Sequence, residues 1–370
     1  MGCPIEGFDG DGIRAAFDAV LADHRHALQY GESEGEPELR AALADWMRSA
    51  GIDARAERIL VTTGSQQSLD LLARLLLDDG DAVAVARPTY LAALSVFQLA
   101  DARLLGLAGD DEGPLPGALE QAAREHPRLR ALYLVPEFAN PTGETIGTAR
   151  RRALLEVAAR HDIVVIEDNP YGALRFAGEG ATPMAALARS LRSEGVNPTV
   201  VSVSSLSKVM APGLRVGWML LPDSLFDAAV RLKQALDLHT STVVQLAAAH
   251  YLRSGRLQAA LPRLSAIYGE RHELLQRALT RHFGDALIVN RPQGGMFVWA
   301  RLQADALVEM HAWLRQGLEH GAIFVPGEAF YDAEPDPSTL RLSFATTAPA
   351  RIDEGVGRLA AAWAALRESL

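Results

Sequence analysis

Lysine is nearly absent from this sequence. Of its 36 basic residues two are lysine, Lys208 and Lys233, and the remaining 34 are arginine. Because arginine does not lose its proton in a protein, it can serve as a generic cation but not as a nucleophile or a general base. The two lysines therefore need a chemical explanation. For Lys233, which lies in a helical pattern, a solvated helix face is the simpler interpretation, whereas Lys208 has a different setting.

Cysteine and long apolar runs are also scarce. Cys3 is the one cysteine, so no internal disulfide can form. No apolar run approaches the length of a membrane-spanning helix, and the first residues lack the basic and apolar regions of a secretory signal. The formal net charge of -10 disfavours nucleic acid or an anionic membrane as a partner. We therefore expect a cytoplasmic protein that binds neither, and we assign no metal ligands.

The chain does have enough apolar residues for a large core, with 49% of its 370 residues hydrophobic. Between about residues 60 and 221, short apolar runs alternate with helical patterns. These runs indicate buried strands at residues 83–86, 131–135, 163–166, 200–203 and 216–221. The alternation predicts an α/β fold whose large domain holds a mostly parallel sheet covered by helices on both faces.

From about residue 254 the pattern changes to helices interrupted by strand-like runs that begin at Gly294, Ile323 and Leu340. This change predicts a smaller α+β domain. We expect residues 30–253 to form the large domain, and residues 1–29 together with 254–370 to form the small one. In open α/β sheets the ligand lies at the carboxyl ends of the strands, so the polar residues after each run are candidate site residues.

Lys208 follows the run at residues 200–203 and lies among small hydroxyl residues. Burial at a strand end lowers the pKa of an amine, and a neutral amine can attack an aldehyde to form an imine. Ser205 and Ser207 can donate hydrogen bonds to phosphate oxygens, and Arg215 can form a forked pair with the same phosphate. The alternative is a strand-to-loop turn with an incidental cation.

Polar side chains follow two more of the runs. Asp168 lies two residues after the run at 163–166. An ionised carboxylate at this place can keep a pyridine nitrogen protonated. Tyr171, one turn later, can hydrogen-bond a phenolic ring oxygen. Asn140, in Asn-Pro-Thr-Gly, can point its amide at the same oxygen. A helix cap for Asp168 and a plain turn for Asn140 are the alternatives.

Three further positions suit an anionic, planar ligand. Ser65 and Gln66 open a helix after an apolar run, where free N–H groups favour a phosphate, although a helix cap also explains them. Tyr90 can stack on a planar ring or simply pack. Arg341 lies inside an apolar, alternating strand and needs a partner, either a substrate carboxylate or an internal salt bridge.

The order of these motifs resembles that of the pyridoxal-phosphate (PLP) dependent aminotransferases of fold type I, class I/II, from about Leu28 to the C-terminus. The string Leu-Gln-Tyr-Gly around Tyr30 resembles the tyrosine-glycine segment of this family. Three strings resemble the branch that contains 2-aminoadipate, kynurenine and aromatic amino-acid aminotransferases: Asp-Leu-His-Thr from Asp237, Gly-Gly-Met-Phe-Val-Trp from Gly294 and Phe-Val-Pro-Gly from Phe324.

The resemblance implies an enzyme that moves an amino group from an α-amino acid to a 2-oxo acid by a ping-pong mechanism. Lys208 would hold PLP as a Schiff base and move the α-proton, with Asp168 and Tyr171 as the other catalytic residues. Asn140 and Arg341 would bind the substrate carboxylate. The implied cofactor-binding residues are Ser65, Gln66, Tyr90, Asn140, Asp168, Tyr171, Ser205, Ser207, Lys208, Arg215 and, from the neighbouring subunit of a homodimer, Tyr30.

Two features depart from the resemblance. Only residues 1–27 precede the tyrosine-glycine segment, so we expect the arm that covers the substrate in relatives to be short or absent. Ala139 stands before Asn140, where many relatives have a polar residue. Two alternatives stay open, because a fold does not determine a function. One is another PLP reaction on the same scaffold, such as β-elimination or decarboxylation, and the other is a non-catalytic ligand-sensing domain like that of some transcription regulators.

Overall fold

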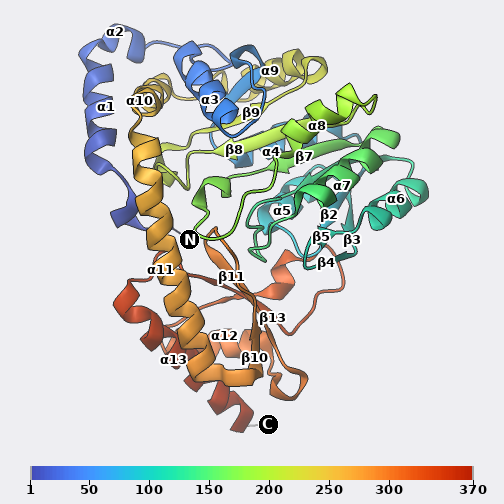
Figure 1. Cartoon of the computed structure of the whole chain (residues 1–370), viewed down its shortest axis with the longest axis vertical. Helices are drawn as coiled ribbons and strands as arrows, with labels where there is room; N and C mark the ends of the chain where they lie inside the picture. The colour runs from blue at the N-terminus through green and yellow to red at the C-terminus, as the bar shows by residue number, and fades with distance from the viewer. Residues whose placement is uncertain (1, 369–370) are drawn as a thin grey trace.

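A computed structural model describes residues 2–368 of the chain, and its main features are a seven-stranded and a four-stranded sheet (Figure 1). The larger sheet has the order β1-β9-β8-β7-β6-β2-β3. Its strands are β1 (Ile59–Thr62), β2 (Ala82–Ala86), β3 (Arg103–Leu107), β6 (Leu129–Leu134), β7 (Val164–Asp168), β8 (Thr199–Ser205) and β9 (Gly217–Leu220). Each of the five strands predicted in this region is therefore present.

The sheet is mostly parallel, as predicted. Strands β3, β2, β6, β7 and β8 run parallel to one another, whereas β9 runs antiparallel between β8 and β1. The sequence did not indicate β3, because this edge strand begins with the exposed Arg103 and contains Gly106, so its apolar signal is weak. The run at 216–221 showed a strand but not its direction, since direction depends on the connection and not on the strand itself.

Helices cover both faces of this sheet. Along β2, Val83 and Val85 pack into one apolar core, while Ala82 and Ala84 pack into a second core on the opposite face. The helices of this part are α3 (Pro37–Ser49), α4 (Ser65–Leu76), α5 (Leu91–Leu99), α6 (Pro116–Glu125), α7 (Thr148–Arg160), α8 (Met184–Ser193), α9 (Asp223–Asp237) and α10 (Thr242–Arg253). Burial on both faces explains why the strands read as continuous apolar runs.

The smaller sheet is antiparallel and has the order β10-β11-β13-β12. Its strands are β10 (Leu287–Val289), β11 (Phe297–Leu302), β12 (Val325–Pro326) and β13 (Thr339–Ser343), and its helices are α12 (Met310–Glu319) and α13 (Pro349–Glu368). The long helix α11 (Arg256–Phe283) runs down one side of the molecule beside both sheets (Figure 1). The predicted change of pattern after residue 254 coincides with the start of α11.

The N-terminal helices α1 (Gly10–Ala22) and α2 (His24–Ala27) lie next to α10, and α1 packs along it (Figure 1). The segment before them turns towards the sheet ends, where the Cys3 thiol donates to the carbonyl oxygen of Ser207 at 3.6 Å. A short hairpin is formed by β4 (Gly109–Asp110) and β5 (Gly113–Pro114). The boundaries proposed between the two domains, at residues 29 and 253, stay a prediction.

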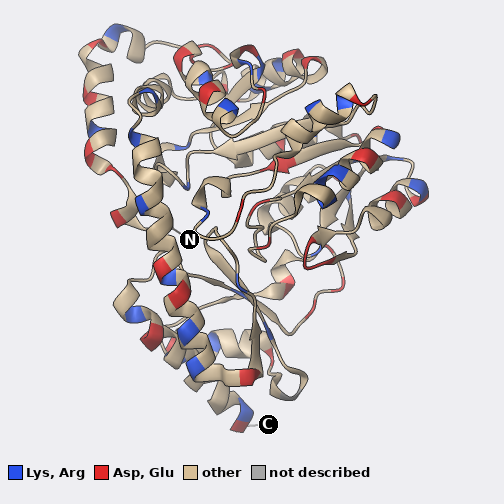
Figure 2. Cartoon of the chain, in the orientation of Figure 1, with Lys and Arg blue, Asp and Glu red and all other residues tan. Residues whose placement is uncertain are grey.

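Short 3-10 helices connect these elements: η1 (Ile5–Gly7), η2 (Ala56–Arg58), η3 (Gly172–Leu174), η4 (Pro212–Leu214), η5 (Gly284–Ala286), η6 (Ala304–Ala306) and η7 (Gly327–Phe330). Most charged residues lie on the outer helices and loops, while the central strands are largely uncharged (Figure 2). Within residues 2–368, no helix combines the length and the apolar character that crossing a membrane requires.

Candidate active site

The candidate residues meet at the carboxyl ends of the large sheet. Ten of them line one cavity of about 130 Å³: Ser65, Gln66, Tyr90, Asn140, Asp168, Tyr171, Ser205, Ser207, Lys208 and Arg215. Asp168 is the last residue of β7, and Lys208 follows β8 by three residues. Parallel strands bring their carboxyl ends to one edge, so side chains far apart in the sequence converge there.

Asp168 contributes a buried carboxyl group to this cavity. It is 2% exposed, and its Oδ2 accepts a hydrogen bond from the Tyr133 hydroxyl at 2.9 Å. Its Oδ1 is buried without a partner among the described residues. Burial raises the pKa of this carboxyl to about 7, against the opposing effects of the Tyr133 hydrogen bond and the Lys208 charge. A cationic ring nitrogen would supply the missing partner, so this position fits PLP.

Tyr133 was missed by the sequence analysis. It lies in the apolar run of β6, where a tyrosine is ordinarily a packing residue, and it is fully buried. The strand register places Tyr133 opposite Ile166, two residues before Asp168, so both side chains lie on the same face. Only strand pairing brings the hydroxyl to the carboxylate, and no sequence signal marks it.

The other end of the cavity is suited to an anion. Ser65 is the first residue of α4, whose N-terminal N–H groups have no side-chain cap. Gly64, before it, has a φ of 91°, and a Cβ there would lie 2.5 Å from Arg215 Nη2. Arg215 donates to the Thr63 carbonyl at 3.3 Å, and Ser205 Oγ accepts from the Ser207 N–H at 3.0 Å. A helix N-terminus beside a guanidinium forms a cradle that fits a phosphate.

Two hydroxyl groups and an amide surround the middle of the cavity. Tyr171 is 6% exposed and Asn140 is 2% exposed. Burial raises the pKa of Tyr171 and of the half-buried Tyr90, so both phenols stay protonated at neutral pH. These groups can therefore donate hydrogen bonds or stack on a planar ring without adding negative charge next to Asp168.

Arg341 reaches this site from β13 of the smaller sheet. Its Nη1 donates to Asn140 Oδ1 at 2.6 Å, and its guanidinium lies 4.2 Å from the Phe297 ring centre and 4.8 Å from that of Phe330. It is 2% exposed, and burial lowers its pKa to about 10. A desolvated guanidinium held between two rings keeps its charge and is suited to a carboxylate.

Tyr30 and Lys233 lie outside this cavity. Tyr30 does not line the cavity; it is 78% exposed, and its ring makes an edge contact with His239 at 5.8 Å. Lys233 was expected on a solvated helix face, and this prediction is wrong. Its side chain is fully buried, with Nζ 2.7 Å from Asp237 Oδ1, because α9 turns this face towards α4 and β1.

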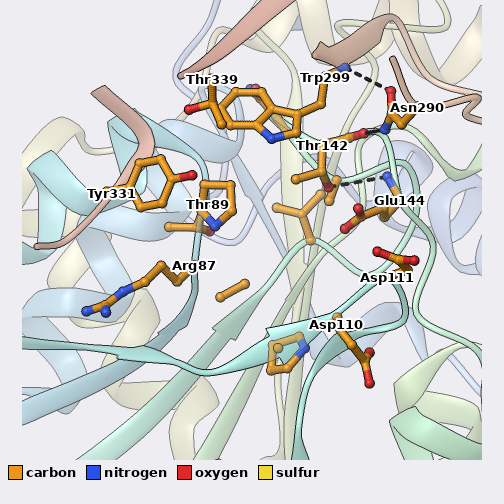
Figure 3. A pocket seen from close by; sticks show the side chains of 18 of the residues that line it. Arg87, Thr89, Asp110, Asp111, Thr142, Glu144, Asn290, Trp299, Tyr331 and Thr339 are labelled. Atoms are coloured by element: carbon orange, nitrogen blue, oxygen red, sulfur yellow. Dashed lines mark hydrogen bonds between the residues drawn. The ribbon is translucent and has the colours of Figure 1, made fainter. Parts of the chain in front are cut away.

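A larger cavity of about 390 Å³ lies beside the first one and shares Val135 and Asn140 with it (Figure 3). Trp299 and Tyr331 contribute rings to its wall, and Glu144 points a carboxyl group towards it. Burial raises the pKa of Glu144 to about 7. Neither lysine lines this cavity, so volume alone does not identify the site of the chemistry.

Comparisons with known proteins show the family of this chain. The family described as aminotransferase class I and II matches residues 9–359. The chain belongs to this family. The aromatic-amino-acid aminotransferase 1 of Thermococcus litoralis is 36% identical over 92% of this chain and 81% of its own length. LysN, the α-aminoadipate aminotransferase of Thermus thermophilus complexed with N-(5'-phosphopyridoxyl)-L-leucine, covers 100% of this chain and 92% of its own, at 35% identity and a TM-score of 0.91.

This aminotransferase therefore has PLP fold type I, uses pyridoxal phosphate, and transfers an amino group between an α-amino acid and a 2-oxo acid. The predicted family, branch, fold class and cofactor are confirmed. Relatives also include longer proteins: the uncharacterized HTH-type transcriptional regulator YdfD of Bacillus subtilis is 30% identical over 92% of this chain and 68% of its own length.

Proposed function

We propose that Lys208, Asp168 and Tyr171 carry the catalysis of this aminotransferase. PLP supplies an electron sink for the substrate α-carbon when its ring nitrogen is protonated. The observation that supports the proposal most directly is the buried Asp168 Oδ1, which lacks a partner among the described residues in the same cavity as Lys208. Asp168 would hold a proton on the ring nitrogen, and its second oxygen is oriented by Tyr133.

Lys208 is the residue that would hold the cofactor covalently and then move the α-proton of the amino acid. Its side chain is half-buried at the cavity, three residues beyond β8. Tyr171 and Asn140 would contact the phenolic oxygen of the ring, and Tyr90 would stack on the ring. Ser65, Gln66, Ser205, Ser207 and Arg215 would hold the phosphate.

The substrate carboxylate would bind to Arg341 and Asn140. The two residues are already joined by a 2.6 Å hydrogen bond, and both are 2% exposed. A carboxylate would accept from the guanidinium while Asn140 donates its amide N–H. The amino donors to test first are aromatic amino acids and 2-aminoadipate, because the two similar aminotransferases are named for these substrates.

The active unit is proposed to be a homodimer in which Tyr30 reaches the phosphate of the neighbouring site. Tyr30 is accompanied by the apolar side chains of Leu28, Leu236 and Leu238, which are 69%, 44% and 54% exposed. The Tyr30 ring also contacts His239, next to Leu238. Apolar surface of this kind is typical of an interface between copies. A cytoplasmic location is proposed as well, supported by the single cysteine.

The proposed function is tested by reducing the purified protein with borohydride and mapping the labelled peptide. We expect a cofactor adduct on Lys208, and transfer of the amino group from an amino acid to 2-oxoglutarate or pyruvate. An adduct on Lys233, or no adduct, would overturn the assignment of Lys208. Release of ammonia without formation of a new amino acid would instead indicate an elimination.

A further inference from the structure

The second lysine of the chain lies in an ion pair inside the molecule. Lys233, on α9, is 0% exposed, and its Nζ lies 2.7 Å from Oδ1 of Asp237, one turn along the same helix. A buried cation is costly unless it is paired, and a chain that uses arginine at 34 other positions has a lysine here. The buried position next to Asp237 therefore favours the compact ammonium group of lysine over a guanidinium group.

The ion pair continues into a chain of hydrogen bonds. Asp237 Oδ2 accepts from Gln67 Nε2 at 2.6 Å, and Gln67 Oε1 accepts from the Thr63 N–H at 2.7 Å. The Thr63 carbonyl accepts in turn from Arg215 Nη2 at 3.3 Å. We call this series of hydrogen bonds the Lys233 relay. It consists of Lys233, Asp237, Gln67 and Thr63, and it ends at Thr63, the residue before Gly64.

The turn at this end is also held by the Gly64 carbonyl, which accepts from Thr62 Oγ1 at 3.2 Å and from the Gln67 N–H at 3.1 Å. Gly64 has no side chain, its φ of 91° lies in the region that favours glycine, and α4 has no side-chain cap at its N-terminus. The free N–H groups of α4 and the guanidinium of Arg215 are both needed at the phosphate. Since Thr63 contacts Arg215 through its carbonyl and the Lys233 relay through its N–H, one peptide segment orients both halves of the cradle.

We propose that Lys233 is a positioning residue for the cofactor phosphate, acting through Asp237 and Gln67 on the turn that begins α4. The proposal rests on the proposed role of Ser65, Gln66 and Arg215 in binding the phosphate. Lys233 touches neither cofactor nor substrate; it neutralises Asp237 and keeps both carboxylate oxygens directed, one to Nζ and the other to Gln67. Without the cation, Asp237 would be a partly buried charge that no longer holds Gln67 in one orientation.

The test compares PLP with pyridoxal, which has the same ring and aldehyde but no phosphate. In the full-length Lys233→Met variant, stripped of cofactor and titrated by absorbance, we expect PLP affinity to fall roughly ten-fold, as for loss of a charge-assisted contact. Pyridoxal affinity should stay as in the wild type. A residue that merely stabilises the fold would lower both affinities together or neither.

Gln67→Met is the second variant, because it breaks the relay without leaving a buried charge unpaired, and it should show the same phosphate-selective loss. Arg128→Met is the matched control; it removes one partner of the buried Asp81 at the opposite end of the sheet and should leave the ratio of the two affinities unchanged. If Gln67→Met, or a folded Lys233→Met, binds PLP as the wild type does, the inference is wrong. Failure of borohydride to label Lys208 in the wild type would overturn the proposed function instead.

Discussion

Asp168 and Arg341 carry opposite charges, both are 2% exposed, and burial shifts the pKa of each towards its neutral form. Under the proposed function, a ring cation would pair with Asp168 and a substrate carboxylate would pair with Arg341. Shifted pKa values of buried ionisable groups are typical of functional sites.

Replacement of Asp168 by Asn is expected to stabilise the cofactor-free protein above neutral pH while removing most of the turnover. The folded pKa of about 7 lies above the ordinary value of 3.8, so the folded chain keeps a proton that the unfolded chain releases. Stability is therefore lost as the pH rises from about 4 to about 7, by on the order of a few kcal/mol. Asparagine does not ionise and avoids this loss.

Thermal unfolding of both proteins at pH 4 and pH 8 measures this difference. The variant should be the more stable one at pH 8, and the advantage should shrink at pH 4, where the wild-type carboxyl is protonated. Parallel pH profiles for the two proteins would contradict a raised pKa at Asp168.

For Arg341, replacement by Lys should weaken the binding of amino acids and 2-oxo acids together. A point charge does not reproduce the bidentate fork, and loss of a charge-assisted pair costs roughly 1.5–3 kcal/mol, or about ten- to a hundred-fold in affinity. Cofactor affinity should barely change. Separate titrations of cofactor and substrate check this, and a variant that loses PLP but still binds substrate would show that Arg341 has been given the wrong role.

At the scale of the element, the site depends on how closely β9 approaches the turn before α4. Gly217 lies opposite Thr62 in the antiparallel pair of β9 and β1. A Cβ on Gly217 would lie 2.6 Å from the Gly64 carbonyl carbon and 2.8 Å from the Ser65 nitrogen. These are backbone atoms, so they yield only if the start of α4 moves.

Substitution of Gly217 by Ala should therefore reduce cofactor affinity by displacing the phosphate cradle. Overpacking of this kind costs typically about 1–3 kcal/mol, or roughly five- to a hundred-fold if it acts on binding alone. Gly213→Ala is a suitable control, because a Cβ there meets nothing within 4 Å although the residue lies close to Arg215 in the sequence. Equal PLP affinity in both variants would show that the turn has room to adjust.

At the scale of the whole molecule, the site is assembled from parts that no single sheet contains. Asn140 comes from the loop after β6 of the large sheet, and Arg341 comes from β13 of the small one, 201 residues later. The remaining part, Tyr30, does not line the cavity of its own chain and is proposed to complete the site of a second copy.

Mixed dimers test this arrangement. Tyr30→Ala and Lys208→Ala homodimers should each be impaired, the first through weak cofactor binding and the second through loss of the amine. If Tyr30 acts across the interface, the mixed dimer contains one site with an intact Lys208 and an intact Tyr30 from its partner, so mixing and reassembling the two proteins should restore turnover. No recovery in verified mixed dimers would mean that Tyr30 serves its own subunit or no site at all.

The family, five strands of the large sheet and most of the candidate site residues could be predicted from the sequence. Apolar runs such as residues 163–166 mark buried strands locally, and the rule that ligands lie at strand ends then selects Asp168 and Lys208. Local patterns suffice here because the carboxyl ends of parallel strands lie at one edge of the sheet, where the ligand binds.

Which side chains contact one another, and which are buried, depends on how the elements pack. The Tyr133 hydroxyl reaches Asp168 through strand pairing, β9 reverses direction, and Lys233 lies inside although its helix reads as amphipathic. Periodicity describes one element against an unspecified core, whereas a contact depends on the order and register of strands and on how two elements pack. Register and packing depend on interactions between segments that are far apart in the sequence, so no single segment specifies these contacts.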